Sequence, residues 1–194
     1  MSNMKTICIL LAAWLGLTTM ASAQVDLTSF DPESLLVLDV AYPGGKGRVV
    51  IMTYEKVAPN HVARIKELAR QEYYDGHVFH RVIDGFMAQT GDPTGTGTGG
   101  TGRKLEPEFS RMPHLRGTLS MARAEAENSA DSQFFICLNR TPFLDNKYTV
   151  WGRVISGMEH ADAIPKGEPP GTPGTIIQMR VAADLADWPS ATIN

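Results

Sequence analysis

The segment FHRVIDGFMAQTGD, residues 79–92, combines one permanent cation with apolar side chains and an amide. Arg81 is the cation, Phe86 and Met87 are apolar, and Gln89 carries the amide. A guanidinium stays protonated at neutral pH and presents several N–H donors in a fixed plane. Beside apolar surface it predicts the wall of a binding site that contacts apolar parts of a ligand and offers it a hydrogen-bond donor. The alternative is an arginine whose stem covers apolar surface while its head lies in water, and this segment alone does not decide between them.

The hairpin around Asp84 and Gly85 allows two registers. A two-residue loop places Arg81 opposite Ala88, whereas a three-residue loop that ends at a left-handed Gly85 places it opposite Met87. Because strand side chains alternate, the second register puts four side chains on one face: Phe79, Arg81, Met87 and Gln89. We favour this register because it brings the guanidinium near an amide that can orient it.

Two further patterns look like ligand-binding motifs but lack the surroundings that such motifs need. Residues 97–102 match G-x-G-x-x-G, which binds dinucleotides where a strand precedes it and a helix begins within it. Here a polar loop precedes the glycines and Pro107 follows soon after, which disfavours that helix. His77 and His80, three apart on an expected strand, should point to opposite faces. We therefore expect no nucleotide, metal or other cofactor. No Ser-His-Asp or Cys-His pair has a local signature, although such residues can meet in space.

The elements that must position Arg81 are short strands between turn signals. Eight segments predict strands: residues 35–42, 47–54, 78–83, 86–90, 118–124, 132–138, 149–155 and 175–182. Helical spacing of Val62, Ile65, Leu68 and Ala69 after Pro59 predicts one helix, and residues 157–164 predict a second, short one. This pattern favours a mainly β protein whose antiparallel sheet closes into a barrel and so leaves no exposed strand edge.

Length and composition indicate one globular domain. The chain has 194 residues, of which 43% are hydrophobic and 20% charged. The formal net charge is −3 and lysines and arginines form no run, so a nucleic-acid partner is not expected. Cys137 is the only cysteine beyond the first 23 residues, so we expect no internal disulfide and a small, buried apolar role for this side chain.

The first residues predict a cleavable secretion signal. Lys5 precedes an apolar run at residues 6–17, and Ala21-Ser22-Ala23 supplies small residues at a cleavage site. The run is too short to span a bilayer, although an uncleaved anchor is the alternative. We expect a signal peptide at residues 1–23, a lead-in at 24–34, one domain at 35–183 and a tail at 184–194. The mature protein should lie in the periplasm without a membrane anchor.

Several long segments together resemble the cyclophilin-type peptidyl-prolyl cis-trans isomerases. They are YYDGHVFHRVIDGFMAQTGDPTGTGTGG, RGTLSMARA, SQFFICL, FLDNKYTVWGRV and GMEHADAI. The likeness runs over residues 35–183, and the short connection EPEFSRMPHLRGTLSMA resembles the compact bacterial members. The resemblance implies a closed eight-stranded antiparallel β-barrel capped by two α-helices, and an enzyme without metal or cofactor.

The resemblance also implies the site. The family's catalytic arginine falls on Arg81. The family's apolar proline pocket falls on Phe86, Met87, Phe135 and Leu144, and its polar partners fall on Gln89 and Gln133. The strand that pairs with the substrate backbone falls on Met121, Ala122, Arg123 and Ala124. Phe143 and Tyr148 complete the site. Phe143 stands where many eukaryotic members carry tryptophan, and Tyr148 where many members carry histidine. Arg123 replaces a common asparagine, and we expect that contact to survive because it uses backbone groups.

The function implied is peptidyl-prolyl cis-trans isomerisation of exported polypeptides, which assists their folding. The expected mechanism is non-covalent, with Arg81 donating a hydrogen bond to the proline nitrogen, and the expected acting form is a monomer. The alternative is a non-catalytic proline-peptide binding module or periplasmic chaperone. Arg81 favours the enzyme, because a protein that only binds such peptides does not need that donor.

Overall fold

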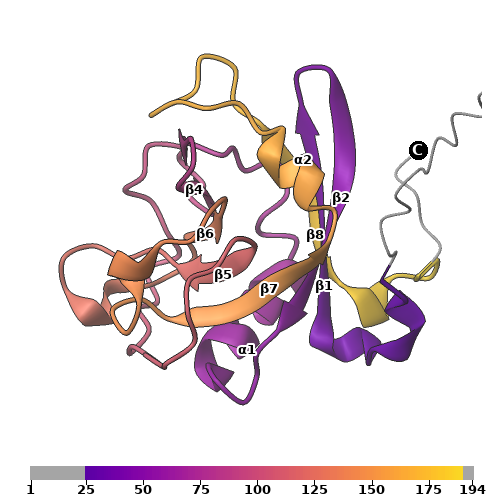
Figure 1. Ribbon diagram of the computed structural model, residues 1–194, viewed down its shortest axis with the longest axis horizontal. Helices are drawn as coiled ribbons and strands as arrows, with labels where there is room; N and C mark the ends of the chain where they lie inside the picture. Colours follow the sequence, from indigo (N-terminus) through magenta and orange to yellow (C-terminus); the bar gives the residue numbers. More distant parts are fainter. Residues whose placement is uncertain (1–24, 190–194) are drawn as a thin grey trace, which may run out of the picture.

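The computed structural model describes residues 25–189, which fold around one strongly curled antiparallel sheet with the shape of a half-barrel (Figure 1). Its eight strands lie in the order β3-β4-β6-β5-β7-β2-β1-β8. The strands are β1 (Leu35–Tyr42), β2 (Gly45–Thr53), β3 (Arg81–Ile83), β4 (Met87–Thr90), β5 (Thr118–Met121), β6 (Phe134–Cys137), β7 (Val150–Ser156) and β8 (Thr175–Val181). The helices are α1 (Pro59–Arg70) and α2 (Met158–Asp162). The predicted mainly β class, with eight antiparallel strands and two helices, is confirmed.

The prediction of a closed barrel is wrong, because the outer strands β3 and β8 form no ladder with each other. In the described part of the chain, only isolated bridges cross the opening, from Val78 to Thr175 and from Val82 to Gly167. The segment facing β3 is the loop at residues 165–174, which contains four prolines. Proline has no backbone N–H to donate, so this segment cannot extend a ladder beside β3.

The predicted hairpin register is also wrong. The N–H of Phe86 donates to the carbonyl of Ile83 at 3.1 Å and closes a loop of residues 84–86, so Arg81 lies opposite Gln89 rather than Met87. Gly85 is left-handed, as expected, with φ +64°. Because the pairing is displaced by two residues and side chains alternate with that period, Arg81, Met87 and Gln89 still share a face.

Strand β3 is shorter than predicted and begins only at Arg81. Phe79 therefore leaves the predicted face and is fully buried in the main core. His77 and His80 precede the strand, so the expected alternation does not apply to them. Strand β5 likewise ends at Met121, before the expected Ala124.

Helices α1 and α2 lie at the lower and upper ends of the sheet in Figure 1. The apolar face predicted for α1 is confirmed, because the side chains of Val62, Ile65, Leu68 and Ala69 are at most 1% exposed and belong to the main core. Helix α2 follows Gly157, whose φ is +82°. A Cβ at this glycine would lie 1.9 Å from the carbonyl oxygen of Arg48, so only glycine permits β2 and the start of α2 to approach this closely.

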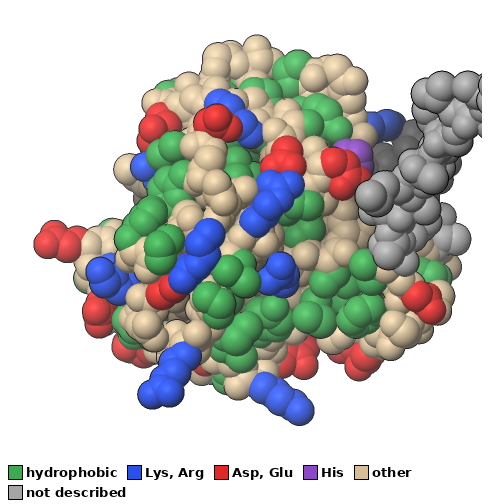
Figure 2. All heavy atoms as spheres, viewed as in Figure 1, with side chains coloured by type: hydrophobic (Ala, Val, Ile, Leu, Met, Phe, Trp, Pro, Cys, Tyr) green, Lys and Arg blue, Asp and Glu red, His purple; other side chains and the backbone are tan. Residues whose placement is uncertain are grey.

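The surface carries both signs of charge. On the face drawn in Figure 2, lysine and arginine side chains are interspersed with aspartate and glutamate. Within residues 25–189, no helix combines the length and apolar character needed to cross a bilayer. The predicted signal peptide lies outside the described residues, and so does the end of the predicted tail.

Candidate active site

The apolar floor of the site lies on the face of β4 and β6 that points away from the main core. Along β6, Phe134 and Ile136 belong to the main core, whereas Phe135 and Cys137 form a separate buried cluster with Met87 and Leu144. Successive strand residues face opposite sides, which explains why the run FFIC is apolar throughout. One strand thus builds both the core of the half-barrel and the floor of a site outside it.

A cavity of about 110 Å³ opens above this floor. Nine of the predicted residues line it: Arg81, Phe86, Met87, Gln89, Ala122, Arg123, Phe135, Leu144 and Tyr148. Ile83 packs against the same apolar cluster and was not a predicted site residue, because the favoured hairpin register places it at the start of the turn.

The other predicted residues lie beside this cavity or beneath it. Ala124 and Gln133 line an adjoining cavity of about 300 Å³. Phe143 is 60% exposed, and its ring centroid lies 5.3 Å from that of Phe86, so it extends the apolar rim. Met121 is 1% exposed and belongs to the main core, so its side chain does not reach the cavity.

The chain after β5 has most of its backbone donors occupied. The N–H groups of Met121, Ala122 and Ala124 donate to the Thr149 carbonyl, the Gln133 carbonyl and the Ser129 hydroxyl, respectively. The N–H of Arg123 has no partner among the described residues. Among the N–H groups of residues 121–124, this one, beside the cavity, remains available to an extended peptide.

The side chain of Arg123 lines the cavity and is held by several contacts with the chain. It donates to the carbonyls of Ala124, Glu125 and Lys147 at 2.8–3.3 Å. Its guanidinium carbon also lies 4.7 Å from the ring centroid of Tyr148, in a cation–π contact. Arg123 stands where asparagine is common in the family, and Tyr148 stands where many members carry histidine. The contact between them therefore holds one unusual residue of the site against the other.

The partner of Arg81 is not the expected amide. Its Nε donates to Glu168 Oε2 at 2.6 Å, and no hydrogen bond joins it to Gln89 within the described residues. The Nε2 of Gln89 instead donates to Gln133 Oε1 at 2.9 Å. Glu168 lies in the proline-containing loop after α2, and no local sequence pattern indicates that this loop returns to β3.

A buried polar network supports the floor from below. His114 contacts Asp145 through Nδ1 and the hydroxyl of Ser120 through Nε2, both at 3.0 Å, and its ring stacks on Phe135. This is a Ser-His-Asp arrangement, but His114 and Ser120 are completely buried and the hydroxyl of Ser120 donates to the carbonyl of Thr149. A nucleophile must reach its substrate, and the buried hydroxyl of Ser120 cannot, so these residues do not perform acyl chemistry. The stacking of His114 on Phe135 indicates that they support the floor of the cavity instead.

Burial and hydrogen bonds together set the ionisation of the groups beneath the floor. Desolvation lowers the pKa of His114, although its hydrogen bond to Asp145 opposes that effect. The hydrogen bond from Arg140 is the main cause that lowers the pKa of Asp145, and bonds from His114 add to it. Cys137 is buried, as predicted, and burial raises the pKa of its thiol to about 11, so it stays protonated at neutral pH.

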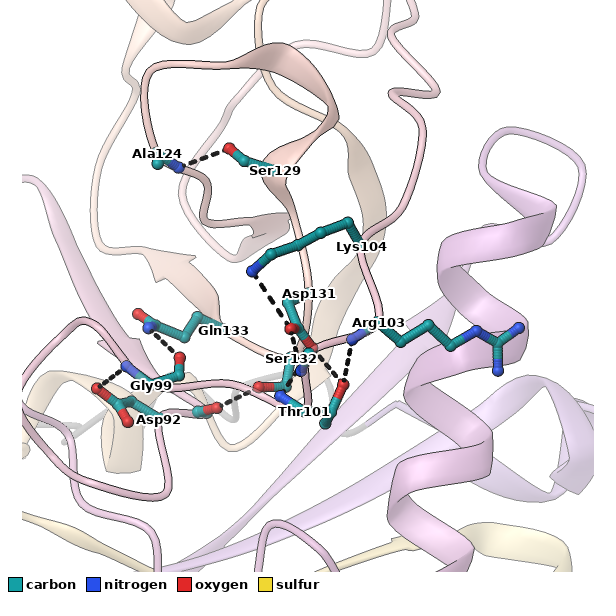
Figure 3. A network of polar contacts seen from close by, with 12 residues as sticks. Asp92, Gly99, Thr101, Arg103, Lys104, Ala124, Ser129, Asp131, Ser132 and Gln133 are labelled. Carbon is teal, nitrogen blue, oxygen red and sulfur yellow. Dashed lines mark hydrogen bonds and ion pairs between the residues drawn. The ribbon is translucent and has the colours of Figure 1, made fainter.

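Backbone N–H groups of the glycine-rich loop at residues 91–102 donate to two carboxylates, Asp92 within the loop and Asp131 shortly before β6 (Figure 3). Gly97 and Gly99 donate their N–H groups to Asp92, and Thr101 and Gly102 donate theirs to Asp131. Burial alone raises the pKa of Asp92, but the hydrogen bonds from residues 94, 97 and 99 outweigh it and lower the pKa to about 2. The N–H groups that a phosphate would require are therefore bound to carboxylates of the chain itself.

Comparisons with known proteins agree with this geometry. The sequence profile of the family described as cyclophilin type peptidyl-prolyl cis-trans isomerase/CLD matches residues 37–182. A probable peptidyl-prolyl cis-trans isomerase from Brucella abortus is 43% identical over 171 residues, covering 79% of this chain and 85% of the relative. A peptidyl-prolyl cis-trans isomerase from Synechococcus elongatus is 49% identical over 127 residues, covering 61% of this chain and 87% of its own.

Solved structures give the same result. The crystal structure of cyclophilin AquaCyp293 from Hirschia baltica superposes with a TM-score of 0.74 at 30% identity, covering 81% of this chain and 77% of that one. A cyclophilin-type isomerase from Cryptosporidium parvum, crystallised in the presence of the dipeptide Ala-Pro, superposes with a TM-score of 0.70 at 30% identity, covering 76% and 98%.

Proposed function

The chain belongs to the cyclophilin-type peptidyl-prolyl cis-trans isomerases, and we propose that it accelerates rotation about X-Pro bonds of exported polypeptides, with Arg81 as the hydrogen-bond donor to the proline nitrogen. One observation carries this proposal. The guanidinium of Arg81 stands at the wall of an apolar cavity whose floor contains Met87, Phe135 and Leu144. A proline ring fits the chemistry of that floor, and the donor lies beside it.

The reaction itself needs no covalent step. The barrier to rotation about a peptide bond is roughly 18–20 kcal/mol, because rotation breaks amide resonance. In the twisted transition state the proline nitrogen regains a lone pair, which planar cis and trans bonds do not offer. A donor aimed at that nitrogen therefore stabilises the transition state more than either ground state.

The guanidinium supplies part of the expected acceleration. A charge-assisted hydrogen bond contributes on the order of 1.5–3 kcal/mol, which corresponds to roughly one to two powers of ten in rate. The rest must come from holding the ring and the preceding carbonyl in a favourable geometry. The buried floor supports this role, because Met87 is 1% and Phe135 5% exposed and both are held by packing on their strands.

The substrate class is a proline-containing peptide in extended form. The unpartnered N–H of Arg123 supports backbone pairing, and the small side chains of Ala122 and Ala124 allow a peptide to approach that segment. The Cryptosporidium neighbour, crystallised in the presence of Ala-Pro, supports the same substrate class.

The cellular setting rests on the first residues of the sequence. Lys5, the apolar run at 6–17 and Ala21-Ser22-Ala23 support export and cleavage before Gln24. N-terminal sequencing of protein from the periplasmic fraction tests this part of the proposal. An intact Met1 recovered with membranes would contradict it.

An exchange assay on a short X-Pro peptide tests the activity. When the protein is added at catalytic concentration, the cis and trans NMR signals of the peptide should broaden or show exchange with each other. Peptide binding without any acceleration would contradict isomerase activity and support the binding module instead.

A further inference from the structure

The ion pair between Arg81 and Glu168 joins the proposed catalytic donor to a loop distant in sequence. The Nε of Arg81 lies 2.6 Å from Glu168 Oε2. Neither Nη atom of Arg81 has a hydrogen-bond partner among the described residues. The carboxylate therefore holds one edge of the guanidinium, while the Nη groups stay available to a ligand in the cavity that Arg81 lines.

The backbone places Glu168 opposite Arg81. Val82 and Gly167 exchange two hydrogen bonds, N–H to carbonyl in each direction, both 2.8 Å long. In such an antiparallel pair, the residue before Val82 faces the residue after Gly167. The loop that makes this bridge follows α2 at the top of Figure 1.

Two further features hold that loop in position. Gly167 has φ +147°, and a Cβ there would lie 2.6 Å from the Cα of Pro170, so a larger residue would displace the loop. The ammonium of Lys166 donates to the carbonyls of Asp162 and Ile164 at 2.8 and 3.2 Å and ties the loop to the end of α2. Glu168 thus extends from an anchored backbone rather than from a freely moving segment.

The ion pair is poorly suited to stabilise the fold. The side chains of Arg81 and Glu168 are 41% and 51% exposed, respectively. Exposed ion pairs contribute little to folding, because water screens the charges and two long side chains lose rotational freedom. We therefore expect this contact to affect the orientation of the guanidinium rather than the stability of the fold.

We propose that Glu168 is a positioning residue for isomerisation, which accepts the Nε hydrogen of Arg81 and so directs the Nη donors at the proline nitrogen. This inference rests on the proposed function of Arg81. Without Glu168 the guanidinium samples several rotamers, and the donor is correctly placed for only part of the time.

The test compares Glu168→Ala, Glu168→Gln and Glu168→Asp with the parental chain in the X-Pro exchange assay. Glu168→Ala should lower kcat about five- to tenfold, the effect of one hydrogen bond, with little change in KM. Glu168→Gln keeps an acceptor at the same length and should recover part of the rate. Glu168→Asp keeps the charge but withdraws the acceptor, so it should remain slow. Glu159→Gln, at a 75% exposed carboxylate on α2, is the matched control and should retain the parental rate.

Two readouts separate positioning from a general structural effect. The Nε–H resonance of Arg81 should be protected from solvent exchange in the parental chain and lose that protection in Glu168→Ala. In an Arg81→Ala background, Glu168→Ala should cause no further loss of rate, because the group that it positions is absent.

The inference is overturned if Glu168→Ala isomerises as fast as the parental chain. It is also overturned if the variant is faster, since the carboxylate would then withhold the guanidinium from substrate, or if the loss persists in the Arg81→Ala background. A parental chain that is inactive overturns the proposed function as well, whereas an active parental chain with unaffected Glu168 variants overturns only this inference.

Discussion

The cavity beside Arg81 and the glycine-rich loop at residues 91–102 differ in how the charged groups next to them are paired. Asp92 and Asp131 each accept several backbone N–H groups of the loop. The guanidinium of Arg81, by contrast, has one hydrogen-bond partner within residues 25–189 and lies over an apolar floor. A charge saturated by its own chain holds structure, whereas a donor left open beside apolar surface can act on a ligand.

Two glutamines connect these regions. Gln89 lines the cavity and donates to Gln133, which in turn donates to the carbonyls of Gly97 and Gly99. The loop therefore fixes the amides that border the cavity, although Asp92 and Asp131, which accept its N–H groups, do not line that cavity. The contrast predicts that changes in the cavity alter activity, while changes in the loop alter stability first.

The largest expected effect is that of Phe135→Ala on the cavity floor. Removing a buried aromatic ring leaves a void, and the free energy of unfolding should fall by about 3–5 kcal/mol. Peptide affinity should fall too, because the ring forms part of the slot. Urea unfolding and calorimetric titration measure the two effects. Unchanged affinity in the folded variant would show that proline does not occupy this floor.

Asp92→Asn, in the glycine-rich loop, should have a smaller effect on the free energy of unfolding. The amide cannot accept all the N–H groups now bound to the carboxylate, and hydrogen bonds to charged groups contribute about 1.5–3 kcal/mol each. The free energy of unfolding should fall by an amount of that order, while kcat per folded molecule stays near the parental value. A loss of kcat without a loss of stability would contradict the division of roles.

Acid should weaken the two regions in sequence. The pKa of His114 is lowered by burial, so its contribution to stability is complete above the unfolded value of about 6.5 and is lost as the pH falls below it. The pKa of Asp92 is lowered to about 2, so its contribution is complete above about 3.9 and disappears only as the pH falls towards 2. NMR titration of both side chains checks this order. A His114 pKa above 6.5 would reverse the predicted sign.

The smallest expected effect concerns Phe143 at the exposed rim. Cyclosporin-sensitive members of the family carry an indole at this position, and phenylalanine lacks the N–H that an indole donates. We expect weak cyclosporin binding, and Phe143→Trp should tighten it by about one hydrogen bond, on the order of 1 kcal/mol. Isothermal titration of both proteins is the measurement. Equal affinities would remove Phe143 as the cause.

The sequence was most informative where a pattern is local. Alternation and turn residues located the eight strands, and helical spacing identified the buried face of α1. Long motifs located the residues that line the cavity. The hairpin register was wrong because one hydrogen bond, from Phe86 to Ile83, moves the loop by one residue.

Contacts between distant segments could not be read from the sequence. The gap between β3 and β8 depends on how a proline-containing loop meets a short strand, and the same loop carries Glu168 to Arg81. The support of Phe135 by His114, Ser120 and Asp145 likewise joins three separate segments. Residue spacing along the chain does not predict these contacts, because each depends on how the whole sheet packs.

Cis-trans exchange of a saturating X-Pro peptide, measured by NMR on the parental chain, Arg81→Ala and Arg81→Lys, tests whether Arg81 is the catalytic donor. Both variants should exchange the bound peptide about ten- to one-hundredfold more slowly, because alanine lacks the donor and lysine lacks the planar fork. Their peptide affinities and thermal midpoints should stay close to the parental values. Exchange at the parental rate in Arg81→Ala would contradict the central claim that directed donation by this guanidinium drives isomerisation.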